Sequence, residues 1–398
     1  MKSVFKMMLA FCAVFVLTST FFFSGAMAEA ASPIYSAADL FTTRDLKQEA
    51  DLSKAVSYTV SDGQDIHISE AGVYVLTGSA KDVTVYVEAG EDDKVQLVLD
   101  GLNVSNTDFP VIYAKEADKV FVTISGDSAL SVTGAFTSDG GTNTDGVIFS
   151  KCDLVLNGTA TLTISSTDNG VVGKDDLKIT GGKYMITAQS KAIEANDSIR
   201  ISDGELILNA GTDGLHAENK EDDTLGYIYI GGGSITIQAG DDGIHANSVV
   251  QIDGGVLSIK AGEGIEGTYI QLNGGTVNIE SVDDGVNAAK KSKSYTPTVE
   301  INDGEITVVM SSGDTDGIDS NGNIIVNGGV ISVTGSSSFD YDGTAQYNGG
   351  TIIVNGQQVS SIPNQMMGGR GNQGWGVGNG FDTNNGRNGN GGRGGRGR

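Results

Sequence analysis

Acidic residues next to glycine recur along the middle and C-terminal parts of the sequence, in the order acid, glycine, apolar residue. Asp-Gly is common turn chemistry, and this accounts for a single copy. It does not account for the paired acids at 241/242, 283/284 and 314/316. The candidate metal ligands in this pattern are Asp213, Asp241, Asp242, Glu263, Asp283, Asp284, Asp314 and Asp316, and Asp342 is expected to continue the series.

Stacked carboxylates would repel each other unless water, protons or a cation neutralised them. If the acids occupy equivalent places in a repeating fold, they lie about 5 Å apart, where like charges destabilise strongly. Ca²⁺ binds about six to eight oxygen ligands, which neighbouring aspartates and turn carbonyls can supply. The acidic pattern therefore predicts calcium sites.

A second set of polar residues lies about two positions beyond these glycines and is expected to point outward. Its candidate carbohydrate contacts are Glu194, His216, His245, Glu266 and Asp319. Two histidines without a fixed third ligand are weak evidence for zinc, so contact with a sugar is the better interpretation. A neutral polysaccharide would instead stack on exposed rings, for which Tyr229 is the candidate, with Tyr227, Tyr269 and Tyr295 beside it.

A repeat must position these residues. Turn motifs such as Leu272-Asn273-Gly274 and Val326-Asn327-Gly328 recur between Gly101 and Gly349 at intervals of 20 to 32 residues. Asn or Asp precedes the glycine in most copies, and we interpret this column as a structural ladder of hydrogen bonds. Repeats of this length are typical of solenoid proteins.

The residues around each turn alternate between apolar and polar, which predicts half-buried strands. Helical periodicity does not separate these strands, so helix-containing crossovers are excluded. The sequence therefore predicts an all-β fold, a right-handed, single-stranded parallel β-helix of about eleven rungs. We expect an N-terminal β-rich cap at residues 33–90 and the β-helix at 91–356.

Both ends of the chain differ from this body. Lys2 and Lys6 precede an apolar run that ends before Ala26-Met27-Ala28, which predicts a cleaved signal peptide at 1–28. The protein is then secreted and extracellular or associated with the cell surface, with no membrane anchor after cleavage. Residues 363–398 are rich in Gly, Asn and Arg and are expected to be disordered.

Charge narrows the possible partners. The chain carries 50 acidic and 25 basic residues, for a net charge of −25. A nucleic-acid partner is excluded because phosphate contacts require clustered Lys and Arg.

Three insertions lengthen the repeat at 137–143, 218–226 and 289–296, and such loops often build the binding face of a solenoid. Neutral surface insertions are the alternative.

Several stretches resemble a family of secreted bacterial β-helix proteins known as a carbohydrate-binding domain. They include Phe41-Thr42-Thr43-Arg44-Asp45 and Asp213-Gly214-Leu215-His216-Ala217-Glu218-Asn219, together with 72–78, 93–101, 117–121 and 174–182. The resemblance covers roughly residues 40–355. It implies a fold similar to that of pectate lyases, bound calcium, and binding of cellulose and polygalacturonate.

Two carbohydrate functions are candidates, and a structural adhesin is a further alternative. The first is a non-catalytic, monomeric protein that binds polygalacturonate through calcium and also cellulose. The second is a calcium-dependent polysaccharide lyase, which needs a base within hydrogen-bond reach of the substrate proton. The basic candidates are Lys174, Lys178, Lys191 and Arg200. Lys178 and Arg200 occupy equivalent outward positions, but Arg200 is expected to face away from the acids, and charges that solvate a strand face are the better interpretation, so the binding protein is favoured.

Overall fold

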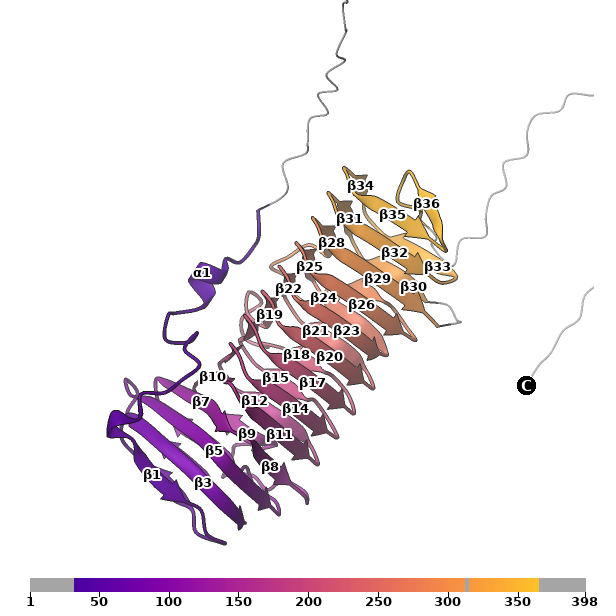
Figure 1. Cartoon of the computed structure of the whole chain (residues 1–398). Coiled ribbons are helices and arrows are strands. Elements are labelled where there is room, and N and C mark those ends of the chain that lie inside the picture. The colour runs from indigo at the N-terminus through magenta and orange to yellow at the C-terminus, as the bar shows by residue number, and fades with distance from the viewer. Residues whose placement is uncertain (1–31, 312–314, 365–398) are drawn as a thin grey trace, which may run out of the picture. The chain divides into compact units, whose positions relative to one another are not determined.

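The computed structural model describes residues 32–311 and 315–364, which form a long stack of short β-strands (Figure 1). The predicted signal peptide, Asp314 and all but the first two residues of the predicted tail lie outside the described residues. The helices of the described part are α1 (Ala37–Leu40) and the 3-10 helix η1 (Leu52–Lys54). Neither is long enough to cross a membrane.

The chain coils through three ladders of strands in a fixed order, which we call ladders A, B and C. Ladder A contains β1 (Val56–Thr59), β3 (Gly72–Lys81), β5 (Lys94–Asn106), β7 (Lys119–Gly126), β10 (Asp153–Gly158), β13 (Asp176–Ile179), β16 (Ser198–Ile201), β19 (Tyr227–Ile230), β22 (Val249–Ile252), β25 (Tyr269–Leu272), β28 (Thr298–Ile301), β31 (Asn323–Val326) and β34 (Ala345–Tyr347). Ladder B contains β8 (Ser128–Val132), β11 (Thr161–Ser166), β14 (Lys183–Ala188), β17 (Glu205–Ala210), β20 (Ser234–Ala239), β23 (Val256–Ala261), β26 (Thr276–Ser281), β29 (Glu305–Met310), β32 (Val330–Thr334), β35 (Thr351–Val354) and β36 (Gln357–Val359).

Ladder C is a separate sheet of 12 strands. Its members are β2 (Ile66–Ile68), β4 (Val85–Glu88), β6 (Ile112–Glu116), β9 (Gly146–Ser150), β12 (Asn169–Gly173), β15 (Ile193–Ala195), β18 (Leu215–Ala217), β21 (Asp242–Ala246), β24 (Glu263–Gly267), β27 (Val286–Ala288), β30 (Asp316–Ser320) and β33 (Ser337–Tyr341). Ladders A and B belong to one sheet because the long strands β3 and β5 run through both.

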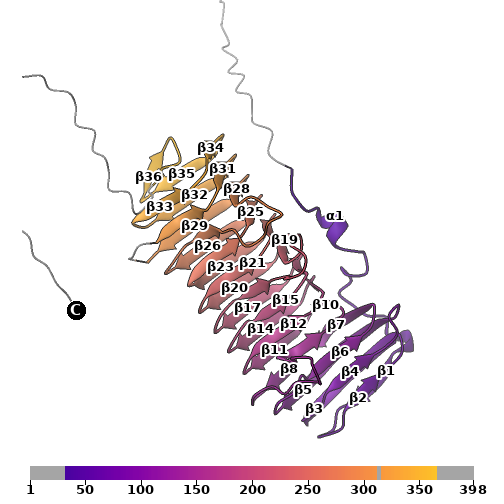
Figure 2. The ribbon, with the colours of Figure 1, turned by 180° about the vertical axis from the view of Figure 1, so that it is seen from behind.

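Successive strands of each ladder run in parallel (Figure 2). In ladder A, for example, Ile228 of β19 pairs with Val250 of β22. Among the described strands the exception is β36, which folds back antiparallel on β35 and covers the C-terminal end of ladder B. The predicted all-β fold with parallel, β-helix-like stacking is confirmed. The right-handed turn and the count of eleven rungs stay predictions.

Alternating side chains produce one continuous core. In β26, Val277 and Ile279 are buried while Asn278 and Glu280 between and beyond them are exposed. Because equivalent residues of neighbouring strands lie in register, each inward side chain packs on its counterpart above and below. The resulting cluster of buried side chains extends from Val60 to Ile362.

The N-terminal region differs from the predicted cap at 33–90. Strand β1 already pairs in parallel with β3, and β2 with β4, so the coil begins at Val56. The turns after β1 and β3 lack the Asn-Gly motif, so the sequence repeat did not include them. Residues 33–48 form no strand and instead lie on the outer face of ladder A; we call them the strap.

Polar and aromatic contacts fix the strap. The Gln251 side chain accepts a hydrogen bond from the Tyr35 backbone N–H at 2.7 Å and donates one to the Tyr35 carbonyl at 2.9 Å. The ring of Tyr35 stacks on Tyr227 at 4.2 Å between centroids. Asp45 is completely buried and pairs with the Lys178 ammonium at 3.0 Å. The strap therefore closes the outer face of ladder A to solvent over several strands.

The predicted Asn/Asp ladder at the turns is present between Asp253 and Asn348. Asn273 donates to Asp253, Asn302 to Asn273, Asn327 to Asn302, and Asn348 to Asn327, each at 2.7 Å. Asn273, Asn302 and Asn327 each donate to the preceding turn of the stack and accept from the following one. This ladder ties successive turns together outside the core.

Asn302→Ala is expected to lower the free energy of unfolding by about 1–2 kcal/mol, because it removes one donor and one acceptor from the ladder. Asn348→Ala removes a single exposed bond at the C-terminal end and should cost less. Urea unfolding of both variants measures the difference. Equal stability of Asn302→Ala and the wild-type protein would contradict a stabilising role for the ladder.

Candidate functional site

The outer face of ladder C brings the two predicted sets of polar residues together. Asp242 lies beside Glu263, and His245 beside Glu266, on adjacent strands. We call the first set the acidic column, and its members in order are Asp213, Asp242, Glu263, Asp284 and Asp316. We call the second set the outer column, and its members in order are Glu194, His216, His245, Glu266, Asn287, Asp319 and Asp340.

Glycine allows the acidic column to stack so closely. A Cβ atom at Gly264 would lie 2.3 Å from the carbonyl oxygen of Gly285 and would clash with it. Without side chains here, the backbone N–H of Asp242 reaches the Asp213 carboxylate at 3.3 Å, and that of Asp316 reaches Asp284 at 3.0 Å. The recurrent acid-glycine pair thus has a structural reason in addition to any role in binding.

Three predicted acids lie elsewhere. Asp342 is outside the acidic column, because Ser337 pairs with Asp316 and occupies the next position. Strand β33 begins earlier relative to its glycine than the repeat suggested, and this brings Asp340 into the outer column beside Asp319. Asp241 and Asp283 are exposed and precede the column residues. Asp314 lies outside the described residues.

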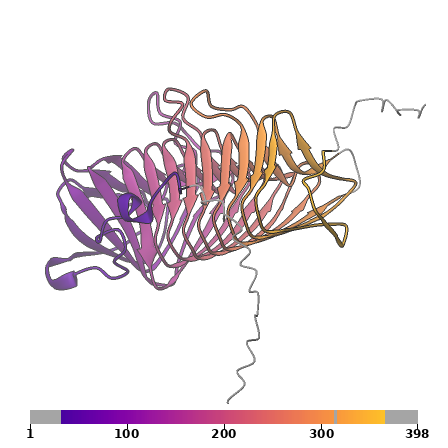
Figure 3. The same cartoon turned by 90° about the horizontal axis from the view of Figure 1, so that it is seen from above.

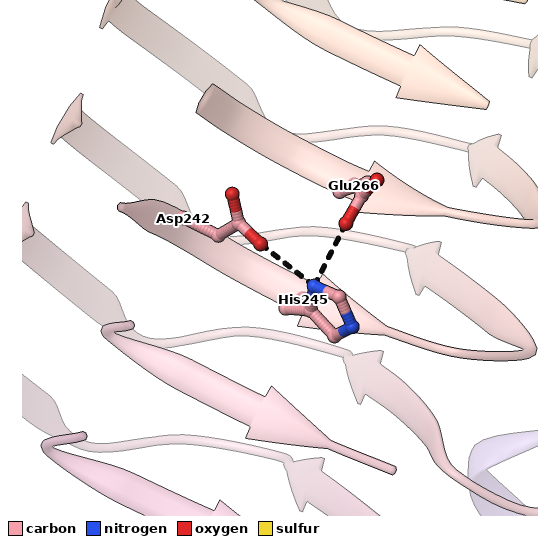
Figure 4. A group of neighbouring side chains, drawn as sticks. All are labelled: Asp242, His245 and Glu266. Carbon is pink, nitrogen blue, oxygen red and sulfur yellow. Dashed lines mark hydrogen bonds and ion pairs between the residues drawn. The ribbon is translucent and has the colours of Figure 1, made fainter. Parts of the chain in front are cut away.

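His245 joins the two columns (Figure 4). Its Nδ1 lies 2.6 Å from Asp242 Oδ2 and 2.8 Å from Glu266 Oε2, and the three groups lie within 4.8 Å of one another. Burial alone would lower the pKa of His245, but the hydrogen bonds to Asp242 and Glu266 outweigh it and raise the pKa to about 9. The imidazolium therefore offsets one of the two carboxylate charges at neutral pH.

His216 repeats the arrangement one strand earlier. Its Nδ1 lies 2.8 Å from Asp213 Oδ2, and its ring stacks on that of His245 at 4.6 Å between centroids. Burial opposes ionisation of Asp213, yet the contact with His216 holds the pKa of Asp213 below its usual value. In the middle of ladder C, contacts with histidine thus offset part of the acidic charge.

The acids nearer the C-terminal end lack such compensation. In the described part of the chain, no Lys, Arg or His forms an ion pair with Asp284, Asp319 or Asp340. Burial, together with the neighbouring acids, raises the pKa of Asp284 to about 6 and that of Asp319 to about 7. Burial and the charges of Glu266 and Asp242 raise the pKa of Glu263 to about 7. Repulsion is therefore concentrated between Glu263 and Asp340.

A polar cavity of about 450 Å³ lies at the other end of the outer column, and we call it the corner pocket. Glu194 forms its floor, with the ammonium groups of Lys174 and Lys191 at 3.4 and 3.2 Å from its carboxylate. These lysines hold the pKa of Glu194 below its usual value against the effect of burial. The lining residues are Lys174, Lys191, Glu194, Asn196, Asp197, His216, Glu218, Asn219, Lys220 and Glu221.

The structure contradicts the prediction that Tyr229 stacks on a sugar. Tyr229 is only 1% exposed, donates its hydroxyl to Asp253 at 2.9 Å, and packs near Phe41 of the strap. Tyr227 is buried under Tyr35 in the same way. Sequence alternation correctly placed these rings outside the core, but it contained no signal that the strap covers them.

Of the four basic residues considered for a lyase, Lys174 and Lys191 contact Glu194 in the corner pocket. The other two lie away from the acidic column. Lys178 and Arg200 are register partners on ladder A, whereas the acidic column lies on ladder C. Arg200 pairs with Asp176, and Lys178 pairs with Asp45 beneath the strap. Sequence reasoning missed Asp340, which required the register of β33, and Lys291, whose ammonium lies 2.8 Å from Glu266.

Comparison with known proteins gives a family assignment. The family model described as "Carbohydrate-binding domain-containing protein" matches residues 62–311 and 265–359. A curated protein of that description from Acetivibrio thermocellus is 32% identical over 130 residues, or 31% of this chain. The matched region spans 46% of that relative, about half of its length.

A solved structure described as a polysaccharide lyase-like protein from C. thermocellum, in a gadolinium derivative, is also similar. It shares 29% sequence identity over 57% of this chain and 94% of its own, with a TM-score of 0.48. The family assignment rests on the family model, which spans most of the coil described above. The chain belongs to the family of carbohydrate-binding domain-containing proteins.

Proposed function

We propose that this protein is a secreted, monomeric and non-catalytic binder of acidic polysaccharide, which it holds along the outer face of ladder C with the help of calcium. Polygalacturonate is the proposed polymer. The family assignment supports carbohydrate binding in general. The observation that carries the finer proposal is the outer column, where the corner pocket and the uncompensated acids share one face.

The other candidate face is less suitable for a sugar. The strap covers the central part of ladder A and buries Tyr227 and Tyr229. Cellulose binding therefore loses two of the rings that the sequence offered. Among residues 32–311 and 315–364, no segment like the strap covers the corner pocket, where amide, carboxylate and ammonium groups line a hollow large enough for a sugar unit.

The C-terminal part of ladder C fits calcium by its donor chemistry. Its neighbouring side chains offer oxygen atoms, the ligands that Ca²⁺ prefers. Asn287 Oδ1 and Asp340 Oδ1 are buried and have no hydrogen-bond partner among the described residues. Asp284 and Asp319 complete the proposed ligand set. Asp242 fits less well than the sequence suggested, because His245 already occupies its carboxylate.

The proposed calcium site and the corner pocket have different roles in binding. Calcium, when bound, supplies positive charge that attracts uronate carboxylates to an otherwise acidic surface. The corner pocket supplies direct contacts: Lys174 and Lys191 offer ammonium donors, and Asn196 and Asn219 offer amides that match sugar hydroxyls. Without a cation, a chain with a net charge of −25 repels polygalacturonate.

The test is a titration of the full mature chain with oligogalacturonate in calcium and in chelator. Binding is expected in calcium and should be lost in chelator. Asp319→Asn keeps the side-chain shape but removes one charge, and it should weaken calcium-dependent binding by about tenfold or more. Isothermal titration calorimetry measures calcium and sugar binding separately.

Glu280→Gln is the matched control, because Glu280 is an exposed acid on ladder B. It should leave both affinities unchanged. Undiminished binding in chelator would refute the calcium bridge. Release of unsaturated uronides during the incubation would refute the non-catalytic assignment and favour a lyase.

A further inference from the structure

Two insertions meet beside the corner pocket. The loop at 218–226 follows β18 and the loop at 289–296 follows β27, so both leave ladder C at the same corner of the coil (Figure 3). The Ser292 hydroxyl donates to the Asp223 carbonyl at 2.6 Å, and Ser292 is 1% exposed. The loops are therefore joined by a buried contact across 69 residues of sequence.

A second connection runs beneath the loops. The buried Thr268 hydroxyl accepts hydrogen bonds from the backbone N–H groups of Lys291 and Ser292 at 3.0 and 2.8 Å, and donates to the Asn247 carbonyl at 2.8 Å. The Asn247 side chain in turn accepts from the Asn219 N–H at 3.1 Å. This relay links the loop at 289–296 to a residue that lines the corner pocket.

Asn219 is the point where the relay enters the pocket wall. Its side-chain oxygen accepts from the backbone N–H groups of Glu221 and Asp222 at 2.9 and 2.8 Å, and its amide donates to Asp197 at 2.7 Å. Asp197, Asn219 and Glu221 all line the corner pocket. A change in the position of Asn219 therefore moves three lining groups together.

The far end of the relay is fixed by charge. Lys291 Nζ lies 2.8 Å from Glu266 Oε1, while the other oxygen of Glu266 faces His245 at 2.8 Å. Glu266 is buried, whereas the Lys291 side chain is 38% exposed, so the pair lies at the edge of the outer column. The ammonium of Lys291 thus holds the start of the loop at 289–296 against the outer column. Neither Lys291 nor Ser292 lines the pocket itself.

From these contacts we infer that Lys291 and Ser292 are positioning residues of the corner pocket, which act through the loop at 218–226 to shape it for an oligouronide. The inference rests on the proposed carbohydrate function. The loops at 218–226 and 289–296 together form one wall beside the corner pocket. The affinity of this pocket for sugar therefore depends on the loop at 289–296 as well as on the loop at 218–226.

The test uses the full mature chain with Lys291→Met, Lys291→Arg, Ser292→Ala and, as a control, Lys260→Met. Lys260 forms an exposed ion pair with Glu280 on ladder B and has no contact with the wall. Two quantities are measured: affinity for trigalacturonate in calcium, and amide hydrogen exchange of residues 219–226. Lys291→Met and Ser292→Ala should each weaken binding by about tenfold, the scale expected for loss of one buried or charged hydrogen bond.

The same two variants should speed hydrogen exchange at residues 219–226. Lys291→Arg should keep the affinity and the exchange rate of the wild-type protein, because it keeps the contact with Glu266. The control should match the wild type. Unchanged exchange and affinity in Lys291→Met and Ser292→Ala would overturn the inference. If the wild-type protein fails to bind trigalacturonate, the proposed function is wrong, and the exchange measurement still decides whether the loops are coupled.

Discussion

Asp45→Ala is expected to destabilise the protein by about 3–5 kcal/mol, the typical cost of leaving a buried charge without its partner. Asp45 is 0% exposed and Lys178 is 5% exposed, so their 3.0 Å pair is shielded from water. Burial opposes the charge on Asp45, but the Thr42 backbone and Lys178 bring the pKa of Asp45 below its usual value. Urea unfolding at neutral pH measures the loss.

A double-mutant cycle separates the pair from the packing of the strap. Lys178→Met removes the ammonium and keeps most of the side-chain volume, so Asp45→Ala combined with Lys178→Met should be more stable than Asp45→Ala alone. Hydrogen exchange at residues 33–48 should rise in Asp45→Ala and fall back in the double variant. Equal stability of the single and double variants would show that the pair is not the source of the effect.

Raising the pH from 4.5 to 7.5 in chelator is expected to cost several kcal/mol of stability, because each unit by which folding raises a pKa corresponds to about 1.4 kcal/mol. Folding raises the pKa of Glu263 to about 7, that of Asp284 to about 6 and that of Asp319 to about 7. The folded state therefore binds more protons than the unfolded state in this range. The stability from these groups is present at low pH and is lost as the pH rises through their folded pKa values.

Calcium should reverse this trend, because the ion binds the deprotonated carboxylates and the folded site holds it better. Thermal unfolding at pH 4.5 and 7.5, each with calcium and with chelator, measures both slopes. Asp319→Asn should flatten the slope in chelator. His245 acts at higher pH: its pKa of about 9 means that its contribution is complete below about pH 6.5 and disappears as the pH rises through 9. A flat profile in chelator from pH 4.5 to 7.5 would contradict the crowding of uncompensated acids.

The sequence predicted the stacked strands because the alternation in stretches such as 276–281 and the Asn-Gly turns are local signals repeated many times. It also placed Asp242 and Glu263 in one column, since each acid directly precedes a glycine and an apolar residue. The sequence-based prediction failed where one turn of the stack differs in register from the others. Ser337 replaced Asp342 in the column because β33 has its own register.

The strap could not be predicted from periodicity. Its residues form no strand, and no local pattern in the sequence indicates their partners. Asp45 pairs with Lys178, and Tyr35 stacks on Tyr227, only in the folded chain. The same reason explains the error at Tyr229, whose outward direction was predicted while its cover was not. The sequence also could not predict which carboxylates are paired with a positive charge, because this depends on which acids lie next to His245 in the folded chain.

The strap also constrains the order in which the chain can fold. Adjacent strands of a ladder are close in sequence, as with Asn273 and Asp253 at 20 residues, so the coil can grow strand by strand from its N-terminal end. The strap contacts with Gln251 and Gln271 instead span 216 and 237 residues. During synthesis the strap leaves the ribosome first, yet its seat is incomplete until β25 has joined ladder A. Docking of the N-terminal end of the strap must therefore come late, and until then Tyr35 stays exposed on a nascent chain, whereas Asp45 can already pair with Lys178 of β13.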